Sequence, residues 1–172
     1  HKISIVQRGF GALGYTMQLP LEDRYLMSQS DLENQLAVLL GGRTAEWLVF
    51  GEISTGAQND LMRATDIARA MVTEFGMSEA IGPVNHEARR RGTFMDTPFA
   101  PERGAYAEET ARVIDAEVKR LVSSAESTAR RILSEKRTYL DGVAAQLLVK
   151  EIIEGAELRD MLAQVPPVAP TG

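Results

Sequence analysis

The clearest pattern along the chain is a stripe of apolar positions that ends at Leu133. Its members recur every three or four residues: Ala111, Ile114, Val118, Leu121, Val122, Ala125, Ala129, Ile132 and Leu133. This spacing places them on one face of an α-helix. Acid–base pairs four residues apart lie on its other faces and support the helix: Glu108–Arg112, Asp115–Lys119 and Glu126–Arg130. The pattern predicts a long amphipathic helix of about seven turns.

A second helix is predicted from Ser30 onward. Ser30 and Glu33 have the spacing of a capping box, and apolar residues then mark one face: Leu32, Leu36, Leu39 and Leu40. The adjacent Gly41 and Gly42 interrupt this pattern, and two interior glycines cost a helix about 2 kcal/mol relative to alanine. Either the helix breaks here, or the glycines allow a neighbouring backbone to approach closely.

Three more helices complete the helical part. One is predicted from about Gln58 to Phe75, with Gly76 as its C-terminal cap. After the long helix comes a shorter one with Leu140, Val143, Ala144, Leu147 and Leu148, and then a last one near Gly155 to Leu162. Residues 82–106 are rich in glycine and proline without any period, and we expect a long loop there.

The first 30 residues have the character of β-strands instead. Ile3 and Ile5 alternate with polar residues, and Leu13–Met17 contains strand-forming Tyr and Thr. Two short strands are not stable alone in water, so we expect them to pack on the helices that follow. The predicted fold is mainly α (α+β), with a small N-terminal sheet. Residues 1–163 are expected to form one domain, followed by a flexible Pro-rich tail at 164–172.

Composition excludes several classes of function. The chain has 172 residues, of which 44% are hydrophobic and 25% charged, and its net charge of −5 gives no positive field for nucleic acid or anionic lipid. The basic run Arg89–Arg91 is expected to be a solvated loop. There is no cysteine, which excludes disulfides, thiolate metal sites and cysteine nucleophiles. No stretch is long and apolar enough to span a membrane, and we expect the chain itself to be soluble.

Neither histidine belongs to a complete site. His1 is terminal, and His86 with Glu87 resembles the beginning of the H-E-x-x-H zinc motif. Position 90 is arginine, so the spacing fails. A lone histidine without partner ligands defines no zinc site, and His86 is expected to lie on the surface.

Two carboxylates stand out by their context. Asp60 lies in the first turn of the helix that begins near Gln58, where an acidic residue complements the helix dipole. Glu46, beside Trp47, is expected to be a partly buried, hydrogen-bonded carboxylate. A role for Glu46 as a metal ligand, or as a group that supports a metal ligand, is the alternative.

Several segments, in order, resemble the peptidase domain of FtsH-type ATP-dependent zinc metalloproteases, which are AAA+ membrane proteases. They are the following: GALGYTMQLP at 11–20, EDRY at 22–25, LGGRTAE at 40–46, STGAQNDLMRAT at 54–65, MVTEFGMSE at 71–79 and GP at 82–83. Shorter matches continue from residue 108 to residue 158, so the resemblance covers residues 1–163. Ordered motifs over that length are far more specific than any one of them.

The resemblance implies a zinc site. In that family two histidines of H-E-x-x-H and a distant aspartate in the N-D-L segment hold Zn²⁺, and that aspartate corresponds to Asp60. The glutamate of H-E-x-x-H activates a zinc-bound water. This chain has no H-E-x-x-H, and the resemblance places that motif upstream of His1. We therefore expect this chain to be the peptidase domain without its zinc-binding helix and general base, and we expect it to be inactive by itself.

A strand is expected to bind the substrate. Proteases that cut many sequences need main-chain recognition, which pairing with an extended peptide supplies. The expected residues are Leu13, Gly14, Tyr15, Thr16 and Met17.

For the whole protein, the resemblance implies a membrane-anchored zinc endopeptidase that degrades unfolded or regulatory proteins. ATP would bind a separate AAA+ module, the subunits would form a homo-hexamer, and the membrane would be reached only through segments outside this chain. The implied location is the cytoplasmic face of a bacterial inner membrane, with an organelle inner membrane as the alternative.

Two other functions remain open. One is a catalytically dead helical oligomerisation module derived from the FtsH family, which the sequence upstream of His1 would distinguish. The other, an unrelated helical binding domain, is disfavoured by the ordered motifs. The apolar stripe from Ala111 to Leu133 also favours self-association. It is longer than one ordinary partner helix would cover, and the uncovered part would favour contact between subunits. The alternative is that the shorter C-terminal helices cover it.

Overall fold

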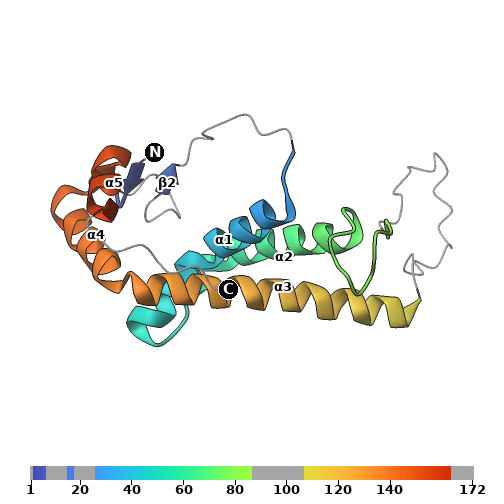
Figure 1. The fold of residues 1–172 in the computed structure, drawn as a ribbon. Helices are drawn as coiled ribbons and strands as arrows, with labels where there is room; N and C mark the ends of the chain where they lie inside the picture. The colour runs from blue at the N-terminus through green and yellow to red at the C-terminus, as the bar shows by residue number, and fades with distance from the viewer. Residues whose placement is uncertain (1, 7–14, 18–25, 87–106, 164–172) are drawn as a thin grey trace, which may run out of the picture. The chain divides into compact units, whose positions relative to one another are not determined.

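The computed structural model describes residues 2–6, 15–17, 26–86 and 107–163 (Figure 1). The chain divides into two compact units. One, the three-helix unit, is Met27–Arg130; the other, the terminal unit, comprises His1–Leu26 and Arg131–Gly172. The mainly α-helical prediction is confirmed. Four predicted features lie outside the described residues: Leu13 and Gly14, the Arg89–Arg91 run, most of the 82–106 loop and the 164–172 tail.

The three-helix unit is built from α1 (Gln29–Phe50), α2 (Gln58–Thr73) and α3 (Glu108–Glu135), whose last residues continue into the terminal unit. The helices share one core, with members from all three: Leu32, Leu36, Ala37, Leu40, Ala64, Ala68, Met71, Val72, Ile114, Val118, Leu121 and Ala125. The long predicted helix is confirmed as α3. Its period of three to four residues is what allows one face to be buried over so many turns.

Most of the apolar stripe on α3 is covered inside this unit. Ile114, Val118, Leu121, Ala125 and Ala129 are all buried. Because all of these except Ala129 share one core with α1 and α2, neither a second subunit nor the C-terminal helices are needed to bury them. The argument for self-association from the stripe is therefore wrong for these residues.

The beginning of α1 differs from the prediction. The capping box is formed by Ser28 and Asp31, not by Ser30 and Glu33: the Asp31 N–H donates to Ser28 Oγ at 3.2 Å, and the Ser28 N–H donates to Asp31 Oδ2 at 3.0 Å. Aspartate can replace glutamate in this reciprocal arrangement because both present a carboxylate to the first turn. The helix then begins one residue before Ser30.

The two glycines inside α1 neither break the helix nor touch a neighbour. The helix continues through Gly41 and Gly42 to Phe50, and it ends at Gly51, whose φ of 74° is left-handed. A Cβ added at either interior glycine would meet no atom of the described residues within 4 Å. The predicted helix break is therefore wrong, and no neighbour among the described residues makes the close contact that was the other explanation.

The end of α2 agrees with the prediction more closely. The helix ends at Thr73, two residues before the predicted Phe75, and Gly76 follows with a φ of 63°. A Cβ at Gly76 would lie 2.9 Å from Pro83 Cα. Glycine is therefore required here twice, by the backbone angle and by the close approach of the 76–83 turn.

Polar contacts join the helices of this unit. Arg112 contacts Glu108 at 2.6 Å and Arg130 contacts Glu126 at 3.5 Å, as predicted. Asp115 was expected to pair with Lys119, but it accepts from Arg69 of α2 at 3.2 Å. The Arg130 guanidinium also lies 4.0 Å from the centre of the Trp47 ring on α1. Two of these contacts thus connect α3 with α1 and α2.

The terminal unit contains the sheet and the last two helices. Strands β1 (Lys2–Ser4), β2 (Tyr15–Met17) and β3 (Ile152–Glu154) form an antiparallel sheet in the order β2-β1-β3, with Ile3 opposite both Thr16 and Ile153. Helix α4 (Arg137–Lys150) leads into β3, and α5 (Gly155–Ala163) follows it. The N-terminal strands are confirmed, but β3, from the far end of the chain, was missed.

Strand β1 is shorter than the predicted alternation of Ile3 and Ile5 with polar residues. Ser4 is buried, whereas Ile5 lies beyond the strand and is exposed. The Ser4 hydroxyl accepts a hydrogen bond from the Val6 N–H at 3.1 Å, so its burial leaves it satisfied.

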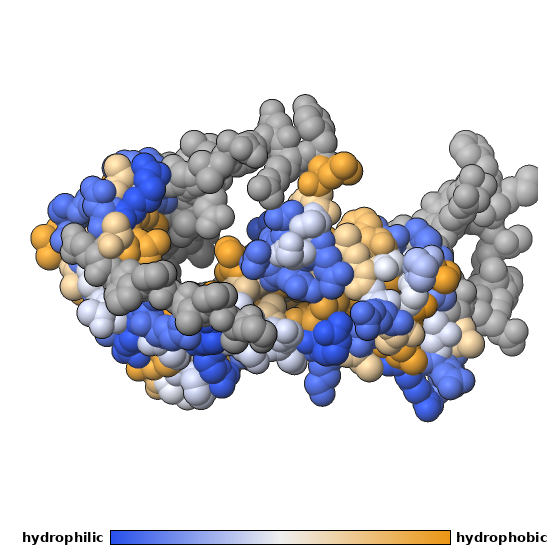
Figure 2. All heavy atoms as spheres, in the orientation of Figure 1, coloured by the Kyte–Doolittle hydropathy of each residue, from blue (hydrophilic) through white to orange (hydrophobic). Residues whose placement is uncertain are grey.

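Apolar side chains also reach the surface, as orange atoms on the visible face of Figure 2 show. The most exposed large ones in the described helices are Phe50 of α1 and Leu148 and Val149 of α4. Among the described helices, none has the length and apolar character needed to cross a bilayer.

Candidate metal-ligand site at the start of helix α2

Asp60 is the third residue of α2, and its side chain is partly buried. One turn further along, Ala64 is completely buried in the core and fixes which face of α2 points inward. The backbone N–H groups of a helix N-terminus favour a negatively charged group nearby. The third position of α2 therefore suits a carboxylate, the kind of side chain that can serve as a metal ligand.

The connection that carries the chain into α2 has a defined local structure. After the left-handed Gly51, Ser54 caps a short 3₁₀ helix, η1 (Thr55–Ala57), which continues directly into α2. The Gly56 N–H donates to Ser54 Oγ at 3.1 Å. Because η1 with its Ser54 cap leads directly into α2, α2 has no side-chain cap of its own.

Glu46, on the last turns of α1, holds this connection. Its Oε1 accepts from Ser54 Oγ at 2.8 Å, and its Oε2 accepts from the Ser54 N–H at 3.1 Å. These two bonds, first that from the hydroxyl, lower the pKa of Glu46, and the nearby charge of Arg43 lowers it further. Glu46 is partly buried and hydrogen-bonded, as predicted. Both of its oxygens are occupied by Ser54.

His86 lies at the opposite end of α2 from Asp60. The His86 backbone N–H donates to the carbonyl of Thr73, the last residue of α2, at 2.7 Å. Thirteen residues of helix separate Asp60 from Thr73, which is about 20 Å. The structure therefore does not bring His86 and Asp60 together.

Asp60 fits the part of a single carboxylate ligand, but it does not complete a site. Within residues 2–6, 15–17, 26–86 and 107–163, no group of three or more His, Cys, Asp or Glu side chains could hold a metal ion. A zinc site needs three protein ligands and an open position, or four ligands when it is structural. The described residues thus supply one donor of such a set.

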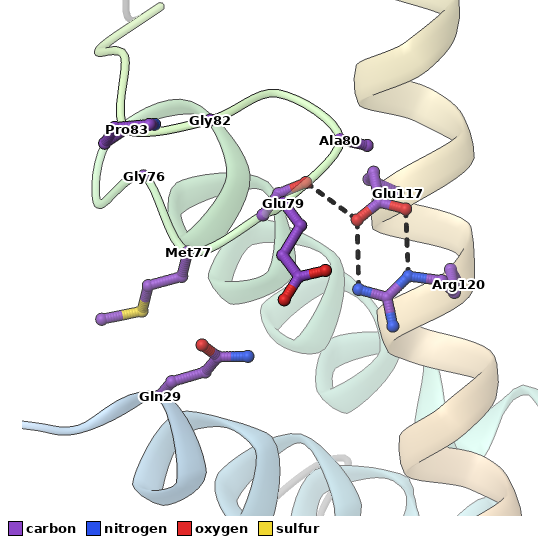
Figure 3. Close-up of a pocket in the computed structure, with 10 residues that line it drawn as sticks. Gln29, Gly76, Met77, Glu79, Ala80, Gly82, Pro83, Glu117 and Arg120 are labelled. Carbon is purple, nitrogen blue, oxygen red and sulfur yellow. Dashed lines mark hydrogen bonds and ion pairs between the residues drawn. The ribbon is translucent and has the colours of Figure 1, made fainter.

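An open cavity of about 970 Å³ lies at the other end of the same unit (Figure 3). Gln29 at the start of α1, the turn at 76–83, and Glu117 and Arg120 of α3 line it. Glu117 accepts from Arg120 Nε at 3.0 Å and from Ser78 Oγ at 2.8 Å. The bonds from Arg120 and then Ser78 lower the pKa of Glu117, although desolvation opposes them.

These groups satisfy one another, so their role is to fasten the 76–83 turn to α3. Sequence reasoning missed the cluster. The spacing of Glu117 and Arg120, three residues apart on a helix, was the only signal for it. The Ser78 contact, 39 residues away, had none.

Comparison with known proteins identifies the family. The model of peptidase family M41 matches residues 1–161. An ATP-dependent zinc metalloprotease FtsH from Ralstonia pickettii is 49% identical over 171 residues, which are 98% of this chain and 24% of that protein. FtsH 4 from Synechocystis is 48% identical over 95% of this chain and 26% of its own length, and FtsH from Thermotoga maritima is 46% identical over 95% and 27%.

By these matches the chain belongs to the peptidases. The chain is a member of peptidase family M41. The FtsH resemblance in its motifs is confirmed. The chain spans about a quarter of the length of the curated relatives it matches.

Proposed function

We propose that this chain is the greater part of the proteolytic domain of an ATP-dependent zinc endopeptidase. The observation that carries the proposal is the family match over residues 1–161, together with relatives that are named ATP-dependent zinc metalloproteases. Residues 1–163 are the domain in this proposal, and 164–172 are its tail.

Asp60 is proposed to supply one zinc ligand. Its position in the first turn of α2, within the segment Asn59–Leu61, supports this role. Zinc, when bound, supplies a Lewis acid that polarises a peptide carbonyl and lowers the pKa of a bound water. The other two ligands and the general base belong to an H-E-x-x-H segment that precedes this chain in the same protein. The chain alone is accordingly inactive and binds zinc weakly, because one carboxylate cannot replace a three-ligand site.

Strand β2 is proposed to recognise the substrate. It lies at one end of the order β2-β1-β3, so only one of its two edges is used within the described sheet. A free edge pairs with an extended peptide through backbone groups, which gives affinity without side-chain selectivity. Tyr15, Thr16 and Met17 form this strand, and Leu13 and Gly14 precede it.

For the whole protein, we propose protein substrates, unfolded or regulatory, that a hexamer of identical subunits degrades with ATP bound in a separate AAA+ module. Its membrane anchor lies in segments other than this one, at the cytoplasmic face of a bacterial inner membrane. The ATP dependence in the names of the relatives supports the first part of this proposal.

ATP-dependent cleavage of casein by the complete protein tests the proposal. Asp60→Asn is expected to abolish cleavage while leaving the helical circular dichroism unchanged. Asp66→Asn, an exposed acid on the same helix, is the matched control and should cleave normally. Full activity in Asp60→Asn would move the ligand assignment to Glu46. No cleavage by the wild-type protein would favour the dead oligomerisation module instead.

A further inference from the structure

Ser54 ties the connection between α1 and α2 to the last turns of α1. Residues 51–56 are all exposed, so the core does not hold them. Ser54 instead takes part in three hydrogen bonds: its Oγ and N–H donate to the two oxygens of Glu46, and its Oγ accepts from the Gly56 N–H. An exposed connection without such a tie would sample many conformations.

The same tie reaches Asp60 through helical backbone. Ser54 caps η1, the Gln58 N–H donates to the Thr55 carbonyl, and α2 begins at once. Asp60 is six residues after Ser54, and every residue between them lies in η1 or in the first turn of α2. A shift of Ser54 therefore moves the Asp60 carboxylate with it.

Gly56 shows how closely this arrangement is packed. A Cβ at Gly56 would lie 3.2 Å from Ser54 Oγ and 3.7 Å from Glu46 Oε1. The first distance is shorter than an ordinary contact, so any side chain here would press on the bonded pair. The lowered pKa of Glu46 agrees with a carboxylate that is charged and accepts both bonds.

The body of α2 is held by the core of the three-helix unit. Ala64, Ala68, Met71 and Val72 are completely buried and hold the body of the helix against the core. Gln58 and Asn59 in the first turn are exposed. Loss of the Glu46–Ser54 bonds would thus free the first turn of α2 while the rest of the helix stays in place.

We propose that Glu46 and Ser54 are positioning residues, which brace the first turn of α2 and so fix the Asp60 carboxylate for the metal. This inference rests on the proposed function of Asp60. It assigns Glu46 a role through Ser54 and not as a ligand. Ligands must be held within about 0.5 Å of the productive geometry, which an untied exposed connection does not achieve.

The test uses the complete protein with Ser54→Ala, and with Ser54→Thr as the conservative variant that keeps the hydroxyl. Ser127→Ala is the matched control, because Ser127 is an exposed serine whose hydroxyl donates to the Ser123 carbonyl of its own helix. Three quantities are measured: the rate of zinc loss to a chelator, kcat and KM for a peptide, and amide hydrogen exchange followed by mass spectrometry.

Ser54→Ala is expected to lose zinc about 10- to 100-fold faster, the range seen when groups that support a ligand are removed. The value of kcat should fall with KM unchanged. Amides at 52–60 should exchange faster, and those at 64–73 should not change. Ser54→Thr should restore zinc retention and kcat, and Ser127→Ala should behave as the wild type. Unchanged ATP hydrolysis shows that each variant is folded and assembled.

Glu46→Gln keeps the inference testable if Ser54→Ala does not fold. An amide oxygen still accepts from the Ser54 hydroxyl, but its NH₂ cannot accept from the Ser54 N–H, so a smaller increase in zinc loss is expected. Its control is Glu33→Gln, an exposed α1 glutamate bonded to Gln29. Zinc loss in Glu46→Gln equal to that in Glu33→Gln would overturn the brace.

Asp60→Asn, measured in parallel, separates the two proposals. If Asp60→Asn loses zinc while Ser54→Ala retains it like Ser127→Ala, the brace is overturned and the proposed function stands. If Asp60→Asn retains zinc, the ligand assignment fails, and with it the purpose of the brace. Faster zinc loss in both variants, with rescue by Ser54→Thr, supports both.

Discussion

Replacing Gly42 by alanine is expected to stabilise the chain by about 1 kcal/mol, the difference in helix propensity between the two residues. The full gain in stability requires that the added methyl group meets no clash. Gly42 lies inside α1 with helical backbone, and a Cβ there would meet no described atom within 4 Å. Alanine therefore adds no clash and loses no contact, while it restricts the unfolded chain.

Gly76→Ala is the matched comparison and should have the opposite sign. Its φ of 63° costs an alanine about 1–2 kcal/mol. The added Cβ would also lie 2.9 Å from Pro83 Cα, so the turn must shift. The same chemical change is thus stabilising at one glycine and destabilising at the other, because only their surroundings differ.

Urea unfolding followed by circular dichroism measures both variants. In a thermal scan, 1 kcal/mol corresponds to about 2–4 °C for a chain of this size. A destabilised Gly42→Ala would refute the reasoning, since it would mean that another part of the chain packs on this face of α1. If Gly42→Ala stabilises this chain but abolishes proteolysis in the complete protein, Gly42 makes a contact that exists only in the complete protein.

Three other predictions concern the core and the polar contacts of the three-helix unit. Ile114→Ala, at a completely buried position, should lower the free energy of unfolding by about 2–5 kcal/mol in urea titrations, and a loss below 1 kcal/mol would contradict the shared core. The pKa of Glu117 is lowered in the folded state, so its contribution to stability is present above the ordinary value of 4.5 and is lost as pH falls through the lower folded value. Glu117→Gln should therefore flatten the pH dependence of the free energy of unfolding in that acid range. An unchanged slope would count against the bonds to Arg120 and Ser78. Trp47 is the single tryptophan, so Arg130→Ala should change its fluorescence and cost about 0.5–1 kcal/mol, whereas an unchanged spectrum would exclude the stacked pair.

Local patterns predicted most of the helices, because a periodic apolar face determines both the helix and the side it buries. The stripe from Ile114 to Ala129 is an example, whereas the cap of α2 is Glu74 and not the predicted Gly76. The position of a cap within a short run of Ser, Asp and Glu is decided by fractions of a kcal/mol, so the sequence placed it at Ser30 when Ser28 holds it.

Features that depend on partners distant in the sequence could not be predicted from local patterns. Strand β3 is three residues long and has no pattern of its own; it exists because β1, nearly 150 residues earlier, pairs with it. The contact of Ser78 with Glu117 and that of Ser54 with Glu46 are of the same kind. Asp60 is proposed as a ligand only through a motif, because a first-turn carboxylate has by itself an ordinary structural role.

The most direct test of the central claim is a crystal of the complete protein measured at the zinc absorption edge. The account predicts an anomalous peak about 2.0–2.2 Å from a carboxylate oxygen of Asp60, with Glu46 bonded to Ser54 and not to the metal. A zinc peak whose ligands do not include Asp60 would contradict it.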